Sequence, residues 1–179
     1  MEVYKSILHL SMELQEGKEK FIQAWGTLGS SWGISRTMAQ VHALLLISPD
    51  PLSNEDVMQE LSVSRGNANI NLRALLDWGL IRKELRPGER KEYFVAEKDM
   101  WKVAKQVIRE RRKRELEPML RILEELKQVE GTKGDKEGEA FTEAISNLYD
   151  LSAKADNTLS TMLRADEHWF LGSFMKLMR

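Results

Sequence analysis

The stretch "SVSRGNANINLRALLDWGLIRKELRPGERKEYFVAE", residues 62–97, decides the fold. Ser64 is a residue type that caps the first turn of a helix. Behind it, apolar residues at steps of five, four and three predict one buried helical stripe: Val63, Ala68, Leu72 and Leu75. Gly79 predicts a helix end in the left-handed conformation. The face opposite this stripe contains glycine and asparagine at the start of the helix. Because both are weak helix formers, helix stability alone does not explain their presence there.

A hairpin is expected directly after this helix. Within residues 80–96, "LIRKEL" and "KEYFVA" alternate as strands do, and "RPGER" between them is a Pro-Gly turn. Upstream, Ser35 and Ser53 are expected to cap two helices, the second over residues 54–61. The expected order is three helices and a two-stranded β-wing, which is a winged helix-turn-helix.

The N-terminal segment is expected to form a helix that reaches about residue 28. Its apolar residues recur at helical spacing, with Gly17 as a candidate break. Gly26, Gly29 and Gly33 are expected to loosen the chain after it. They do not form a phosphate-binding loop, because no strand precedes them and no Gly-Lys-Ser/Thr ending follows.

The C-terminal part predicts two more helices. The first covers residues 97–129, and Pro118 is expected to kink or restart it. A Gly-rich, charged connection at 130–139 precedes a second helix over 140–163 and an apolar closing segment.

These patterns predict a mainly α protein with three regions. Residues 1–30 form an N-terminal helical segment for dimerisation or support. Residues 31–97 form the winged helix-turn-helix domain, and residues 98–179 form a helical dimerisation or effector region. The N- and C-terminal helices together offer more apolar face than a small winged core can cover. A single monomeric bundle is the alternative.

Composition narrows the functional classes. The 179 residues include no cysteine, which excludes disulfides and thiolate chemistry. No signal peptide and no apolar run of membrane-spanning length is evident, so a cytoplasmic protein without membrane contact is expected. Net charge is −1, but residues 62–114 contain 15 basic and 7 acidic side chains between two acidic flanks. A basic middle of this kind is typical of a protein that contacts a polyanion.

The exposed start of the helix after residue 63 is the candidate recognition surface. In a helix-turn-helix the second helix enters the major groove of double-stranded DNA with its N-terminal residues first. Arginine suits guanine, asparagine suits adenine, and glycine lets the backbone approach closely. The candidates are Ser64, Arg65, Gly66, Asn67, Asn69, Ile70 and Arg73. The alternative is that they are polar surface residues without a partner.

The basic turn of the hairpin is the second candidate contact. Arg86, Arg90 and Lys91 would lie along a phosphate backbone or enter the minor groove. The alternative is an ordinary solvated hairpin. Glu89 would repel phosphate, so we expect it to pair with Arg90 or another nearby arginine. The basic run "RERRKR" at 109–114 is interpreted as a solvated helix face rather than a phosphate contact.

Other chemistry has little support. Aromatic rings can enclose a quaternary ammonium, so five rings are candidates for an effector cage, although their helical spacing favours core packing. The rings concerned are Trp25, Trp32, Trp101, Tyr149 and Trp169. The three histidines are scattered, and no catalytic pattern stands in a recognisable context. We therefore expect no enzyme activity, no cofactor and no metal.

Residues 62–97 resemble the winged-helix core of GbsR-type regulators, a branch of the MarR-like transcription factors. The resemblance lies in the "SRGN" start, the "LRALLDWGLI" passage and the "PGERK.YF" wing; it is strong over about residues 30–100. It implies a homodimer, joined through helices outside the core, that reads an inverted-repeat operator. It also implies a small-molecule effector, choline-type osmolytes in the characterised branch.

The function expected from the sequence is therefore sequence-specific DNA binding that regulates transcription. A winged-helix module that binds another protein without direct DNA readout is the alternative.

Overall fold

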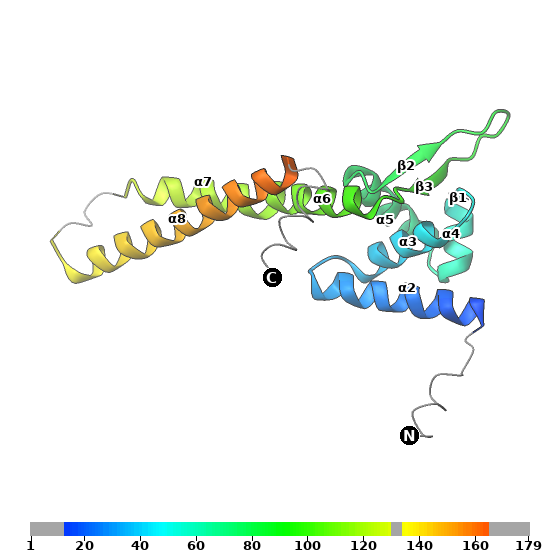
Figure 1. The fold of residues 1–179 in the computed structure, drawn as a ribbon, viewed down its shortest axis with the longest axis horizontal. Helices are drawn as coiled ribbons and strands as arrows, with labels where there is room; N and C mark the ends of the chain where they lie inside the picture. Colours follow the sequence, from blue (N-terminus) through cyan, green and yellow to red (C-terminus); the bar gives the residue numbers. More distant parts are fainter. Residues whose placement is uncertain (1–12, 130–133, 165–179) are drawn as a thin grey trace, which may run out of the picture. The chain divides into compact units, whose positions relative to one another are not determined.

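A computed structural model describes residues 13–129 and 134–164 of the chain (Figure 1). The chain forms two compact units, residues 1–98 and residues 99–179. The first unit contains α2 (Leu14–Ser31), α3 (Arg36–Ile47), β1 (Leu52–Ser53), α4 (Asn54–Leu61), α5 (Arg65–Asp77), β2 (Ile81–Glu84) and β3 (Tyr93–Ala96). The second contains α6 (Met100–Arg111), the π-helical turn η2 (Arg112–Leu116), α7 (Glu117–Leu126) and α8 (Lys136–Arg164).

Helix α3 is the centre of the first unit. It packs against α2, α5, α4 and β3, and most of its side chains are buried. Leu72 and Leu75 of α5 and Phe94 of β3 are at most 5% exposed and complete this core. The mainly α, winged helix-turn-helix fold expected from the sequence is confirmed.

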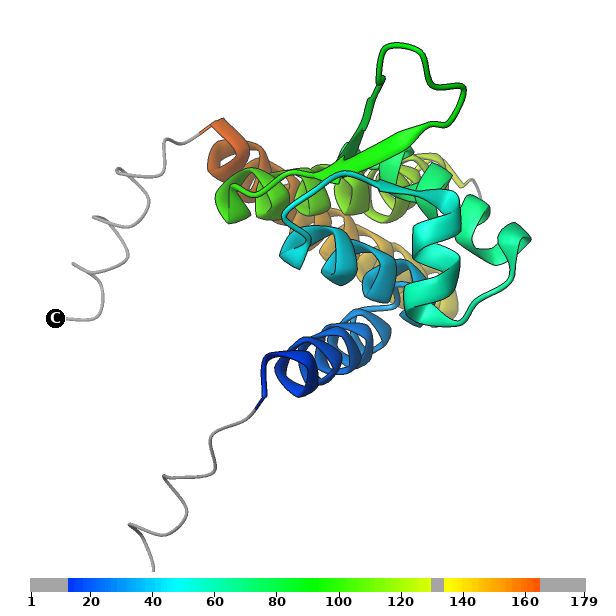
Figure 2. The same ribbon diagram turned by 90° about the vertical axis from the view of Figure 1, so that its right-hand side faces the viewer.

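The hairpin of β2 and β3 is the expected two-stranded wing, and a third strand that was not predicted, β1, joins its sheet. The strand order is β1-β3-β2, all antiparallel, with Leu52 of β1 opposite Phe94 of β3. Strand β1 has only two residues, too few for an alternating pattern to be recognised in the sequence. The segment between β2 and β3 extends away from α3, α4 and α5 (Figure 2).

Helix α2 also differs from the expectation. It continues through Gly17, Gly26 and Gly29 to Ser31, so these glycines neither break nor loosen it. A Cβ added at Gly29 would lie 2.5 Å from the Cβ of Ala39 on α3. The glycine therefore permits close packing of two helices, which periodicity within one helix does not reveal.

The expected helix caps are confirmed. Ser35 accepts a hydrogen bond from the Met38 amide at 3.4 Å, and Ser53 and Asp56 form a reciprocal capping box at the start of α4. The backbone hydrogen bond from Ser53 holds the pKa of Asp56 below its ordinary value. Lys98 donates to the last carbonyls of α3, at 2.8 Å from Leu45 O and 3.0 Å from Ser48 O.

Helix α5 ends as expected. Gly79 has φ 66°, in the left-handed region. Its amide donates to Leu76 O at 2.9 Å, and the Leu80 amide donates to Leu75 O at 3.0 Å. This pair of bonds is a Schellman motif, which leads the chain directly into β2.

In the second unit, the helical segment expected over 97–129 changes character before Pro118. The π-helical turn η2 precedes α7, in which proline occupies one of the first two positions. Because proline has no amide hydrogen and crowds the preceding turn, a widened turn accommodates it. Helix α8 begins at Lys136, four residues before the expected start at 140. Residues 130–133, between the two helices, lie outside the described range.

Side chains of the second unit are only partly covered. Val103, Leu123 and Ile145 are buried, and Arg112 binds Asp156 through Nε at 2.6 Å. Several large apolar side chains of α7 and α8 are more than a third exposed: Met119, Ile122, Phe141, Leu148 and Leu151.

Within the described ranges, no helix has the length and apolar character that crossing a bilayer requires.

Candidate nucleic-acid interface

The start of α5 presents a continuous exposed surface, which we call the reading face. All seven sequence-predicted residues of this helix are exposed: Ser64, Arg65, Gly66, Asn67, Asn69, Ile70 and Arg73. Behind them Ala68, Leu72 and Leu75 are at most 1% exposed. The helix is therefore anchored on one side and open on the other.

The first turn of α5 has free backbone donors. Ser64 accepts a hydrogen bond from the Asn67 amide at 3.3 Å, which caps the helix. The amides of Arg65 and Gly66 precede the first intrahelical bonds, so they point out of the helix end together with its positive dipole. A Cβ added at Gly66 would meet nothing within 4 Å. The fold itself does not require glycine at this position, whereas close approach of a partner would.

Two arginines of the reading face have intramolecular partners. Arg65 forms an ion pair with Glu55 of α4 at 3.0 Å, and Arg73 Nε donates to Asn69 Oδ1 at 3.3 Å. Exposed contacts of this kind add little stability. They do restrict where the side chains point. Ile70 between them is 68% exposed.

Asn71 belongs to the same site, although it was not among the predicted residues. It is 6% exposed, and its Nδ2 donates to Asn67 O at 2.8 Å and to Asn67 Oδ1 at 2.7 Å. The signal was present in the sequence: Asn71 lies three residues after Ala68 and four before Leu75, which places it on the buried stripe.

A cluster of interacting side chains lies where the loop of the wing meets β3. The Arg86 guanidinium lies 4.1 Å from the centroid of the Tyr93 ring, and the Tyr93 hydroxyl donates to Glu89. The expectation that Glu89 pairs with an arginine was therefore wrong; its carboxylate serves the tyrosine and raises the pKa of Tyr93 above the ordinary value. The Tyr93 hydroxyl therefore satisfies the Glu89 carboxylate without an ion pair, while Arg86 stacks on the face of the same ring.

The turn that contains Glu89 is otherwise basic. Arg90 and Lys91 are both exposed there, next to Gly88 with φ 83°. The three predicted wing cations thus lie on one hairpin, with Arg86 stacked on a ring and the other two open to solvent.

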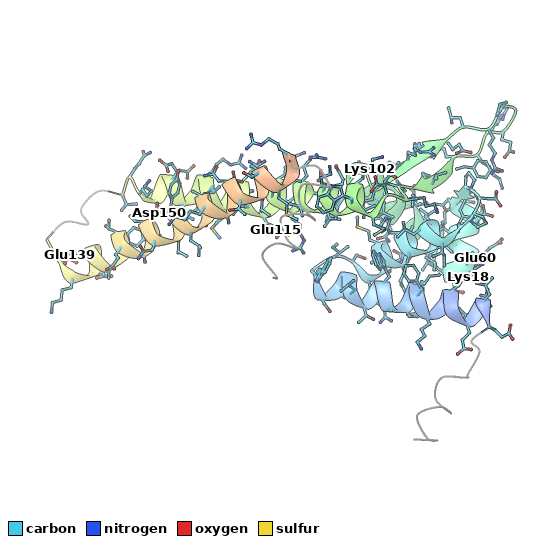
Figure 3. The ribbon with its side chains drawn as sticks, in the orientation of Figure 1. Lys18, Glu60, Lys102, Glu115, Glu139 and Asp150 are labelled. Carbon is cyan, nitrogen blue, oxygen red and sulfur yellow. The ribbon has the colours of Figure 1, made fainter. Side chains whose placement is uncertain are left out.

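A groove of about 570 Å³ lies between α2, α3 and α4. Lys18 of α2 and Glu60 of α4, both labelled in Figure 3, line it. None of the described residues that line it is aromatic.

The rings considered for an effector cage are divided between the two units. In the first, Trp25 lies 6.2 Å from the His42 ring, and Trp32 is 54% exposed. In the second, Trp101 and Tyr149 each lie beside a different lysine, Lys105 and Lys127. Trp169 lies outside the described residues.

Within residues 13–129 and 134–164, no cluster of three histidine or acidic side chains is suited to hold a metal ion.

The chain matches no family model and no curated protein. Among solved structures, it is similar to the crystal structure of a transcriptional regulator, with a TM-score of 0.62 and 20% identity. That alignment covers 82% of this chain and 95% of the other. A mutant of S. aureus MepR bound to an oligodeoxyribonucleotide aligns over 98% of this chain and 93% of that chain, with 12% identity and a TM-score of 0.36. The first similarity shows a common fold; the second is too low to infer one.

Proposed function

We propose that this chain is a sequence-specific DNA-binding regulator of transcription. The observation that supports the proposal best is the reading face of α5. Its polar side chains and glycine are exposed at the start of a helix whose opposite side is fully packed. A surface helix without a ligand would gain stability from alanine or glutamate at these positions.

The reading face suits the major groove of B-DNA. A helix 10–12 Å wide fits a groove of about 12 Å. Arg65, Asn67, Asn69 and Arg73 supply hydrogen-bonding groups for base edges, and exposed Ile70 suits a thymine methyl group. The capped helix end would receive a phosphate. Because several of these side chains are already held by neighbours, binding would immobilise fewer rotamers.

The wing would bind the phosphate backbone beside the groove. Arg90 and Lys91 are exposed on a hairpin that extends from the helices. Contacts of this kind position a protein on DNA without reading the sequence. Arg86 stacks on Tyr93 and would stiffen the wing where its loop meets β3.

We further propose that the regulator is a cytoplasmic homodimer that reads an inverted repeat. The exposed apolar side chains of α7 and α8 support this, because single soluble chains seldom leave such residues clustered. A two-fold axis would place two α5 helices about 34–36 Å apart, one turn of DNA. The GbsR-type subtype and a small-molecule effector are proposed on the sequence resemblance alone.

A salt titration on random duplex DNA tests the proposal against a protein-binding module. A DNA-binding winged helix releases counterions, so the logarithm of its affinity falls linearly with the logarithm of salt concentration. A protein-binding module would show weak binding with little dependence on salt. Selection of bound sequences from a random pool would then yield the operator.

A further inference from the structure

The pair Asn67–Asn71 has a defined hydrogen-bonding polarity. Asn71 is almost fully buried, and its Nδ2 group has two hydrogens. One is directed to the backbone carbonyl of Asn67 at 2.8 Å and the other to Oδ1 of Asn67 at 2.7 Å. Both hydrogens of one buried amide are therefore used on the residue one helical turn earlier.

The orientation of both side chains follows from the backbone. A carbonyl oxygen only accepts hydrogen bonds, so the atom of Asn71 that faces Asn67 O must be the nitrogen. The atom of Asn67 that faces this nitrogen must in turn be an acceptor, which is Oδ1. Because oxygen and nitrogen leave Cγ in different directions, Nδ2 of Asn67 is turned away from Asn71. Asn67 is exposed, so this donor faces solvent.

We propose that Asn71 is a positioning residue that makes Asn67 read a hydrogen-bond acceptor on a base edge. The inference rests on the proposed function and assigns a polarity within it. In the major groove the acceptors are purine N7, guanine O6 and thymine O4, whereas adenine N6 and cytosine N4 are donors. An unrestrained asparagine can turn either end of its amide to the DNA. Held by Asn71, Asn67 leads with its donor.

A merely structural Asn71 would satisfy the Asn67 carbonyl and do nothing else. Asn71→Ser separates the two roles. A serine hydroxyl can donate back to the carbonyl four residues earlier, as Thr27 does to Gln23 O in α2. It has a single hydrogen, so it cannot also hold Oδ1 of Asn67. The helix bond is kept and the orientation is lost.

The test measures affinity for the selected operator and for a random duplex with the wild type, Asn67→Ala, Asn71→Ser and the double variant. We expect Asn67→Ala to weaken operator binding about tenfold, which corresponds to one base contact. Asn71→Ser should weaken it several-fold, and the double variant should resemble Asn67→Ala, because the two residues act through one contact. Binding to random DNA should not change. Asn69→Ala is the matched control, since Asn69 has no bond to Asn71. The loss of operator affinity in Asn69→Ala should add to the loss in Asn71→Ser.

Base analogues test the polarity directly. For the wild type, an analogue that lacks one acceptor at the position read by Asn67 should weaken binding as much as Asn67→Ala does. The same analogue should not weaken Asn67→Ala further. Any of three results would overturn the inference: additive losses of affinity in the double variant, no loss of affinity in Asn71→Ser, or weaker binding only to analogues that lack a donor. A wild type with no sequence preference would overturn the proposed function itself, which is a separate result from these.

Discussion

The start of α5 combines residues that weaken a helix with residues that anchor it. Gly66, Asn67 and Asn69 are poor helix formers: relative to alanine, glycine costs about 1 kcal/mol and asparagine several tenths of a kcal/mol. Leu72 and Leu75 behind them are at most 1% exposed, and burial of each leucine side chain contributes about 2 kcal/mol. Packing therefore exceeds the local cost, which leaves the exposed positions free to serve recognition.

Arg73 tests base reading at a single residue. Arg73→Ala removes a guanidinium that suits a guanine edge, so operator binding should weaken by about 1–3 kcal/mol while random-DNA binding changes little. Parallel titrations of both duplexes at one salt concentration measure the difference. Lys20→Ala, which removes an exposed cation from α2, is the control and should leave the operator preference intact. Equal losses on both duplexes would contradict a base-reading role.

His42 makes the stability of the first unit depend on pH. Burial, with Lys98 as a smaller cause, lowers the pKa of His42 from 6.5 to about 4. The unfolded chain therefore binds the proton more readily, and stability is full above pH 6.5 and declines as the pH falls toward 4. Between pH 7 and pH 5 the free energy of unfolding should fall by about 2 kcal/mol.

Urea unfolding of the wild type and His42→Gln at both pH values measures this effect. The variant should lose that part of the decline. Asp56, whose pKa is lowered from 3.8, acts only at lower pH. The same decline in both proteins would show that His42 is not its source.

At the scale of elements, glycines in two helices have opposite roles. Gly29 of α2 faces Ala39 so closely that an added methyl group would lie 2.5 Å from its Cβ. Gly66 of α5 has open space around it. Both look alike in the sequence, because what distinguishes them is a neighbouring helix in one case and an absent partner in the other.

Alanine at each glycine should therefore act in opposite directions. Gly29→Ala should lower the free energy of unfolding by about 1–3 kcal/mol through overpacking. Gly66→Ala should raise it slightly, by up to about 1 kcal/mol, and weaken DNA binding. Thermal unfolding and operator titration of both variants give the comparison. Full operator affinity in Gly66→Ala would show that no partner approaches this position.

At the same scale, Arg90 tests whether the wing contacts the phosphate backbone of DNA. Arg90→Ala should lower affinity for all sequences and reduce the slope of log affinity against log salt by about 1, because one phosphate contact is lost. Lys154→Ala, an exposed cation of α8, serves as the control of equal charge change. If Arg90→Ala leaves the slope unchanged, the wing does not touch the backbone.

Much of this element pattern was predictable from local chemistry. The caps at Ser35, Ser53 and Ser64 and the left-handed Gly79 are signals within a few residues, and the structure confirms them. Strand β1 and the packing of Gly29 depend on residues from other elements, so they were missed or misread. The Asn71 bonds lie within α5 and could have been anticipated, because Asn71 falls on the buried stripe of Ala68 and Leu75.

At the scale of the whole molecule, the second unit presents an apolar surface on α7 and α8. Leu148 and Leu151 lie on α8 and are 51% and 66% exposed. The apolar closing segment expected after the last helix lies within residues 165–179, outside the described range.

Introducing negative charge on this surface tests the proposed homodimer. Leu148→Glu with Leu151→Glu should shift the protein to a monomer, because a carboxylate in an apolar interface has no partner. Sedimentation equilibrium measures the mass, and operator binding should become weak while single half-site binding remains. Asp150→Ala, a neighbouring exposed position, is the control. A dimer of unchanged strength would place the interface elsewhere.

The central claim, that α5 reads DNA sequence, is tested most directly by one ratio. The affinity for a duplex selected from a random pool is divided by the affinity for a scrambled duplex of equal length at one ionic strength. The account predicts a ratio of about a thousand or more, as expected for specific DNA-binding proteins. A ratio near one would contradict it, because a surface that binds every sequence equally reads none.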